Sequence, residues 1–188
     1  MEAKEYPILF SGEMVRALLA GRKTQTRRLS ESWMKVKAGD RLWVRETWAT
    51  EKLMDPFRPV DIPAQYQNYY GEKPFIAYKA DGPVDAGKTR TSLHMPRWAS
   101  RITLEATADA RRERLQDIDR EGALSEGIQV LPLQSADDPS AWYQSSPGVN
   151  QARTPQDSFR KLWESLHGET APWASNPMVT VISFRVVA

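Results

Sequence analysis

The feature that most constrains the fold is a change of period at Gly21, where a helical pattern gives way to an alternating one. Residues 11–20 predict one short helix with its apolar residues on one face, and glycine is the usual residue just past a helix end. Residues 24–28 then alternate as in a β-strand, which places Thr26 and Arg28 on the same face. The sequence therefore predicts a helix that turns directly into a strand, in a chain of the α+β class.

Lys23 lies at the corner between this helix and this strand. By simple alternation it is not on the Thr26 face, but irregular backbone at the corner would let its long side chain reach that face. An amine, a hydroxyl and the Arg28 guanidinium would then be close together. A structural interpretation competes with this one: basic residues after a helix complement its dipole, and threonines favour strands. On spacing alone the structural interpretation comes first.

Size and composition exclude several classes of protein. A chain of 188 residues suits one domain with a core of its own. No apolar run is long enough to span a bilayer, and the N-terminus does not resemble a signal peptide, so we expect no membrane association. The absence of cysteine excludes disulfides, thiolate nucleophiles and sulfur-bound zinc, and it fits a cytoplasmic protein. With only His94 and His167 as histidines, we expect neither a metal centre nor a cofactor.

Hydrophobic patterning divides the rest of the chain into short elements and two irregular segments. The clearest helix starts at Thr154, which can cap it, continues with Pro155 at the first helical position and ends near Gly168. Residues 51–74 and 131–153 show no sustained period and are expected to be loop insertions. Strands are expected over Pro7–Phe10, Arg41–Trp48, Phe75–Ala80, Arg101–Ala106 and Val179–Val187.

Two glutamates lie where a carboxylate needs a partner. Glu46 falls on the apolar side of its strand, where an unpaired charge is costly, and Lys23 or Arg28 could pair with it. A surface glutamate at a strand end is an equal alternative. Glu126 lies in the last turn of a short helix that stops at Gly127, where the helix dipole disfavours negative charge. If Glu126 is functional, Lys23 is the candidate cation.

Several stretches together resemble the ASCH domains found in phages and prophages, which are relatives of the PUA domain. The matching segments are Pro7–Phe10, Gly21–Arg28, Gly39–Trp48, His94–Leu104 and Phe159–Leu166. This resemblance implies a small mixed β-barrel with flanking helices, as a single domain over residues 1–188 that carries the two insertions. Scaffolds of this type often expose a groove for an oligonucleotide.

A second likeness covers only the core, which is similar to small bacterial ASCH enzymes that hydrolyse N4-acetylcytidine. Their lysine and threonine correspond to Lys23 and Thr26, and an alignment with one gap places their glutamate at Glu126. The resemblance implies Thr26 as nucleophile, Lys23 as base and Glu126 as an aid to proton transfer, with an acylated nucleoside as substrate. The two insertions are departures from these enzymes and could reshape the cleft.

Two other functions remain open from the sequence. In a non-catalytic module for RNA or single-stranded nucleic acid, the phosphates would contact Lys23, Arg28, Arg45 and Arg97. The residues expected to bind either a substrate or a nucleic acid are Arg28, Arg45, Glu46, Arg97 and Trp98. For Trp98 alone, a role in the core is the stronger interpretation. Ribonuclease activity ranks third, because the chain has no evident metal site and no paired histidines. The sequence leaves the oligomeric state open.

Overall fold

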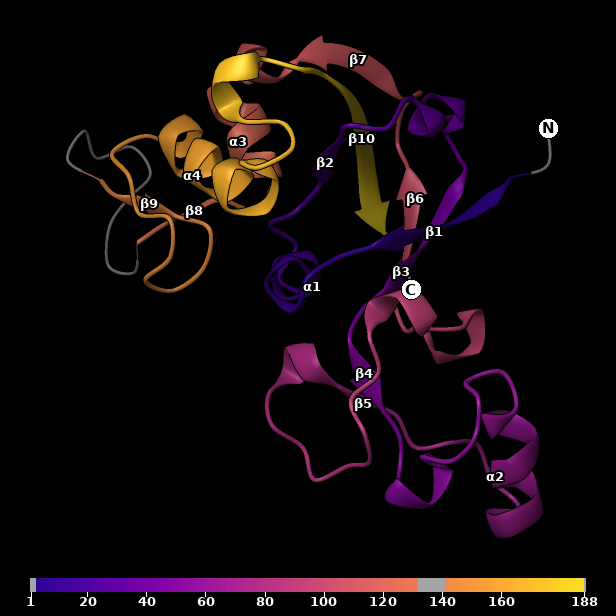
Figure 1. Cartoon of the computed structure of the whole chain (residues 1–188). Helices are drawn as coiled ribbons and strands as arrows, with labels where there is room; N and C mark the ends of the chain where they lie inside the picture. The colour runs from indigo at the N-terminus through magenta and orange to yellow at the C-terminus, as the bar shows by residue number, and fades with distance from the viewer. Residues whose placement is uncertain (1–2, 132–140, 188) are drawn as a thin grey trace. The chain divides into compact units, whose positions relative to one another are not determined.

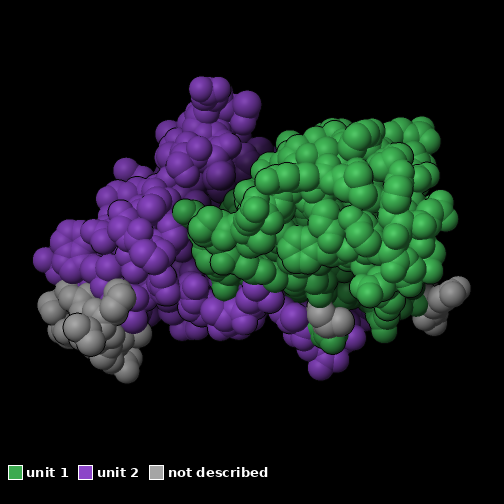
Figure 2. Space-filling model, turned by 90° about the horizontal axis from the view of Figure 1, so that it is seen from below, with its two compact units in different colours: residues 1–16, 41–104, 187–188 green, residues 17–40, 105–186 purple. Residues whose placement is uncertain are grey.

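The computed structural model describes residues 3–131 and 141–187 and divides the chain into two compact units. Unit 1 comprises residues 1–16, 41–104 and 187–188, and unit 2 comprises residues 17–40 and 105–186 (Figure 2). Helix α1 and strand β6 each begin in unit 1 and end in unit 2. Within the described ranges the chain contains four α-helices together with β-strands, so the expected α+β class is confirmed (Figure 1).

Unit 1 is built around short strands and a small apolar core. Strands β1 and β3 pair in parallel, with Ile8 opposite Val44, and β4 pairs antiparallel with β5. Trp48, Met54 and Ile62 are completely buried and form the centre of the core. The elements that begin in unit 1 are β1 (Glu5–Leu9), α1 (Gly12–Leu19), β3 (Arg41–Arg45), β4 (Trp48–Ala49), α2 (Ile62–Tyr70), β5 (Ala77–Tyr78) and β6 (Thr103–Ala106), with 3-10 turns at Lys52–Met54, Lys79–Asp81, Ser92–His94 and Arg97–Ala99.

The segment 51–74, expected to be an irregular loop, contains helix α2, so that prediction was wrong. Ile62 and Tyr66 are four residues apart and both buried, which is the spacing of one helix face. Gly71 ends the helix with a positive φ of 70°. Tyr66 donates a hydrogen bond to Glu51 at 2.6 Å, and this bond with burial raises the pKa of Tyr66 to about 12. Only two apolar residues of the helix face the core, which is too few for a visible period.

Unit 2 is organised around the long strand β10, which is apolar along most of its length. Strand β10 pairs antiparallel with β2 and with β7 (Figure 1). Val181 lies opposite both Arg27 and Arg111. The elements of unit 2 are β2 (Gln25–Arg28), β7 (Arg111–Arg114), α3 (Arg120–Ser125), β8 (Gln129–Val130), β9 (Tyr143–Gln144), α4 (Pro155–His167) and β10 (Met178–Val186), with 3-10 turns at Glu31–Lys35, Leu115–Asp117 and Trp173–Ser175.

Helix α4 begins as its sequence predicts, since the Thr154 side chain accepts a hydrogen bond from Asp157 N at 3.1 Å. Its apolar face, with Phe159 and Trp163, packs into the core of unit 2. The expected insertion 131–153 is described only in part, because residues 132–140 lie outside the described residues. In its described part, β9 pairs with β8.

The expected closure into a small barrel is not shown. The strand pairings described for each unit leave end strands, with β1 paired to β3 alone and β2 paired to β10 alone. Inside the two units, the features that form the candidate site are the turn that precedes β2 and the end of α3. Both belong to unit 2.

Candidate functional site

Backbone contacts hold the turn before β2 against the end of helix α3. Thr24 N donates to Ser125 O at 2.8 Å, and Lys23 and Glu126 form an isolated antiparallel bridge. The Arg22 guanidinium donates to Gly127 O at 3.1 Å. Gly127 has a φ of +100°, so the chain leaves the helix through a backbone conformation that residues other than glycine rarely adopt. These contacts fix Lys23 directly opposite Glu126.

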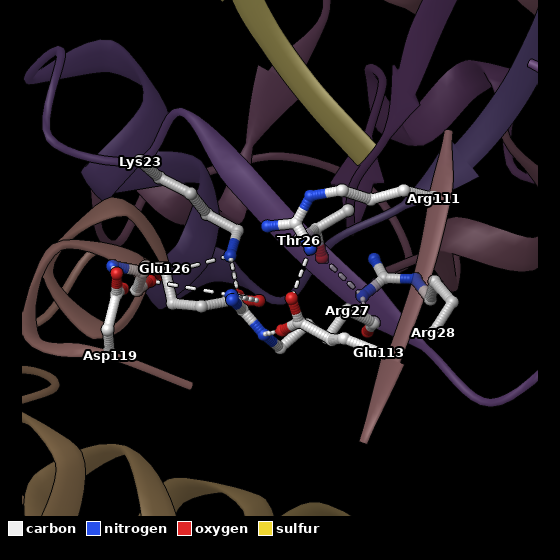
Figure 3. Close-up of polar contacts among 9 residues, drawn as sticks. Lys23, Thr26, Arg27, Arg28, Arg111, Glu113, Asp119 and Glu126 are labelled. Atoms are coloured by element: carbon white, nitrogen blue, oxygen red, sulfur yellow. Dashed lines mark hydrogen bonds and ion pairs between the residues drawn. The ribbon is translucent and has the colours of Figure 1, made fainter. Parts of the chain in front are cut away.

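The Lys23 side chain is completely buried and ends on Glu126 (Figure 3). Its Nζ lies 2.6 Å from Glu126 Oε2 and 3.0 Å from the Glu126 carbonyl oxygen. Only 4% of the Glu126 side chain is exposed. A buried charge this far from water needs such a partner, and Lys23 is the cation that the sequence named for Glu126.

Arg27 is a member of the cluster that the sequence did not indicate. Its Nη1 lies 3.2 Å from Glu126 Oε1, and its Nε lies 2.7 Å from Glu113 Oε1, so one guanidinium joins two carboxylates. A Cβ at Gly122 would come within 2.7 Å of Arg27 Nη2. Glycine at this position therefore leaves the space in which Arg27 reaches the end of α3.

Glu113 was also missed, although the sequence carries a weak signal for it. It is the one acidic residue in the basic strand β7, beside Arg111, Arg112 and Arg114. Arg111 Nη1 donates to Glu113 Oε2, while Arg27 donates to its other oxygen (Figure 3). A lone acid among arginines on a strand indicates a salt-bridge network rather than a purely basic surface.

Thr26 has a different partner from Lys23. Its side chain is completely buried, and Arg28 Nη1 donates to Thr26 Oγ1 at 2.6 Å (Figure 3). Alternation along β2 places Thr26 and Arg28 on one face and Arg27 on the other. The structure thus brings Lys23 together with Glu126, and Thr26 together with Arg28.

Burial lowers the pKa of Lys23 from its ordinary value. The Glu126 carboxylate acts in the opposite direction, while the charges of Arg28 and Arg27 lower the pKa further. The net effect is a lower pKa than that of a lysine in water. A buried lysine whose pKa is shifted by burial and by neighbouring charges is a candidate functional residue.

The partner of Glu46 is Arg101, not Lys23 or Arg28. Arg101 Nε and Nη2 bind the two Glu46 oxygens at 2.9 and 3.1 Å, and the same guanidinium binds Asp81 at 2.7 Å. Glu46 is buried, as its position on the apolar side predicts. Burial raises the pKa of Glu46, although its bond to Arg101 acts in the opposite direction. All three residues belong to unit 1.

Arg45 and Arg97 were also expected to bind nucleic acid, and both belong to unit 1 and have partners there. Arg45 donates to Leu93 O at 3.2 Å. Arg97 makes two hydrogen bonds to Glu5, at 3.0 and 3.1 Å.

Trp98 is half-buried and packs against the core of unit 1. Its ring contacts Trp48 edge-on with centroids 5.6 Å apart, and its Nε1 donates to Pro59 O at 3.1 Å. These contacts agree with the structural interpretation of Trp98 as a core residue. They give no indication of a ring presented for stacking.

Neither a metal centre nor a membrane segment is indicated by the described residues. Within them, no group of three or more histidine, aspartate or glutamate side chains is placed to hold a metal ion. No helix in the same residues combines the length and apolarity needed to cross a bilayer.

Comparison with known proteins gives a similarity at the level of structure. No family model matches the chain. No curated protein matches it either. A solved structure, that of protein EF3133 from Enterococcus faecalis V583, described under DUF984, is similar with a TM-score of 0.43 and 11% sequence identity. The similarity covers 100% of this chain and 77% of that one, and its low score carries no conclusion about activity.

Proposed function

We propose that this protein hydrolyses the amide bond of an acylated nucleoside such as N4-acetylcytidine. The observation that carries the proposal is the completely buried Lys23, whose pKa is lowered and whose amine contacts Glu126 at 2.6 Å. Lys23 precedes Thr26 by three positions in the sequence. Lysine in an ordinary surface position would be protonated and unable to act as a base. The resemblance of this core to N4-acetylcytidine hydrolases supplies the substrate class.

In the proposed reaction, Thr26 Oγ1 attacks the amide carbonyl and its proton passes to Lys23. The carbon–nitrogen bond then breaks, and the amine of the nucleoside leaves with the proton returned by Lys23. Water hydrolyses the resulting threonine ester, which releases the acid and restores the hydroxyl. Glu126 orients the lysine amine and assists the transfer of that proton to the leaving amine.

Arg28 has to release the Thr26 hydroxyl before attack. In the structure its guanidinium holds Thr26 Oγ1, and the threonine is completely buried. We expect the substrate carbonyl to take over this guanidinium, which then stabilises the negative charge that develops on the carbonyl oxygen. Arg28 thereby acts on the nucleophile in the free protein and on the substrate in the complex.

The test is to incubate the purified protein with N4-acetylcytidine and measure cytidine and acetate by chromatography. Thr26→Ala should remove the activity, and Thr26→Ser should retain part of it because the hydroxyl is kept. Thr24→Ala is the matched control, since Thr24 is exposed in the same segment and its side chain has no role in the reaction. Urea unfolding of each variant separates loss of activity from loss of fold.

Two outcomes would contradict the proposal. One is the absence of cytidine from a folded wild-type protein over a panel of acylated cytidines and adenosines. The other is full activity in Thr26→Ala, which would exclude Thr26 as the nucleophile even if hydrolysis occurs.

A further inference from the structure

Unit 1 contains a hollow of about 420 Å³ between residues 56–59 and 88–94. It is independent of the proposed hydrolase site, whose residues belong to unit 2. Its walls present basic groups, including Arg58, Lys88 and His94, beside an apolar surface. The volume falls in the range of small-molecule sites, roughly 300–1,000 Å³. The chemistry of this lining indicates what it would hold.

The wall formed by residues 88–91 is fixed to the core by its backbone. Arg90 and Trp48 exchange two backbone hydrogen bonds, at 2.8 and 3.1 Å. Gly87 N donates to Thr50 O at 2.6 Å, and a Cβ at Gly87 would lie 2.4 Å from Asp55 Oδ1. This close approach leaves little freedom, so the wall is formed before any ligand arrives.

The wall formed by residues 56–59 is fixed in a similar way. Arg58 pairs with Asp61 at 2.7 Å, and Pro59 O accepts a hydrogen bond from Trp98. Phe57 packs partly against the core of unit 1 and also lines the hollow. One wall therefore offers an aromatic ring in a fixed position.

The positive charge of the hollow is only partly neutralised. Arg90 is buried and binds Met54 O at 2.9 Å, with Asp55 at 3.5 Å. For the Lys88 ammonium and the His94 ring, the described part of the chain offers no hydrogen-bond or ion-pair partner. These two groups are free to bind an anion, and no carboxylate lines the hollow itself.

We infer that this hollow binds an organic phosphate that carries a flat ring, of the size of a nucleoside monophosphate. Lys88 and His94 contact the phosphate, with the buried Arg90 adding positive charge behind them. The ring lies against Phe57 and the neighbouring prolines, since aromatic faces stack bases with little sequence preference. A free nucleotide and the phosphorylated end of a single strand share this chemistry.

Calorimetric titration of the full chain tests the inference. AMP should bind, and both adenosine and inorganic phosphate should bind at least about tenfold more weakly, because each lacks one half of the ligand. Lys88→Gln should weaken AMP binding about tenfold. Lys73→Gln is the matched control, an exposed lysine of unit 1 outside the hollow, and should leave binding unchanged.

A trinucleotide with and without a 5′-phosphate distinguishes the two sources. Tighter binding of the phosphorylated strand than of AMP assigns the hollow to a strand end, and the reverse order assigns it to a free nucleotide. The inference is overturned if AMP does not bind, or if a folded Lys88→Gln protein binds it as the wild type does. Because the readout is binding in unit 1, its failure is distinct from a failure of the proposed hydrolysis.

Discussion

Each unit of this protein buries a glutamate among basic residues, and the two clusters differ in the cation they use. In unit 2, Glu126 meets a completely buried lysine, and Arg27 holds its other oxygen. In unit 1, Glu46 meets Arg101, whose single guanidinium binds both Glu46 and Asp81. Both glutamate side chains are at most 4% exposed, so burial of the carboxylate does not distinguish them.

The difference lies in what the cation can do with its proton. Burial acts to lower the pKa of Arg101, but its bonds to Glu46 and Asp81 outweigh this and raise it, so the guanidinium stays charged. For Lys23, burial outweighs the carboxylate and the pKa falls. The unit 1 cluster is therefore an ion pair with a fixed charge, whereas the lowered pKa of Lys23 is the feature on which the proposed proton transfer in unit 2 depends.

The largest expected effect that separates the clusters is on catalysis. Lys23→Met should lower kcat/KM for N4-acetylcytidine by about 10²–10⁴-fold, the usual contribution of a general base. Arg101→Met should leave kcat/KM within about twofold, provided that the protein is folded during the assay. Lys37→Met, at an exposed lysine of unit 2, is the control for loss of a positive charge. Equal losses in the Lys23 and Arg101 variants would abolish the functional distinction.

The second expected effect is on stability, and here the Arg101 variant should lose more than the Lys23 variant. Arg101→Met leaves Glu46 buried without its cation and should cost about 3 kcal/mol in urea unfolding at pH 7. Lys23→Met should cost less, about 1–2 kcal/mol, because Arg27 remains on Glu126. The loss in Arg101→Met should shrink as the pH is lowered, since Glu46, whose pKa is already raised, then becomes neutral. A larger loss in Lys23→Met than in Arg101→Met would contradict the comparison.

A third effect compares one glycine from each unit. A Cβ at Gly87 would meet Asp55 and, at 2.9 Å, the Thr50 carbonyl, which is backbone and cannot easily move. A Cβ at Gly122 would meet mainly the end of the long Arg27 side chain. Gly87→Ala should therefore cost more stability, about 1–3 kcal/mol, than Gly122→Ala. Gly122→Ala should instead lower activity by displacing Arg27 from Glu126. Unfolding free energy and hydrolysis rate are measured on the same preparations of each variant.

What could be predicted from the sequence is largely local. The helix of residues 11–20, the Thr154 cap of α4 and the stop at Gly127 depend on residues within a few positions of one another, and the structure has α1, α4 and the end of α3 at these places. Helix α2 was missed because tertiary packing of Ile62 and Tyr66, rather than a strong periodic pattern, stabilises it.

Pairing between distant residues was harder to predict. Glu46 and Arg101 are 55 positions apart, and nothing in either local pattern names the other. Lys23 and Glu126 are farther apart still, at 103 positions. The helix dipole at Glu126 called for a cation and made Lys23 the candidate, and the resemblance to known hydrolases placed both residues in one site.

The smallest expected effect is a shift in the pH dependence of activity, and it tests the Lys23 assignment directly. Activity should rise with pH through the lowered pKa of Lys23, because only the neutral amine accepts the Thr26 proton. Glu126 raises that pKa, so Glu126→Gln should move the rising limb of kcat/KM to lower pH, even while the rate itself falls. Glu113→Gln is the matched control, since Glu113 also binds Arg27 but does not contribute to the pKa of Lys23. If the rising limb of the kcat/KM profile stays at the same pH in Glu126→Gln, or moves to higher pH, a group other than Lys23 takes the proton.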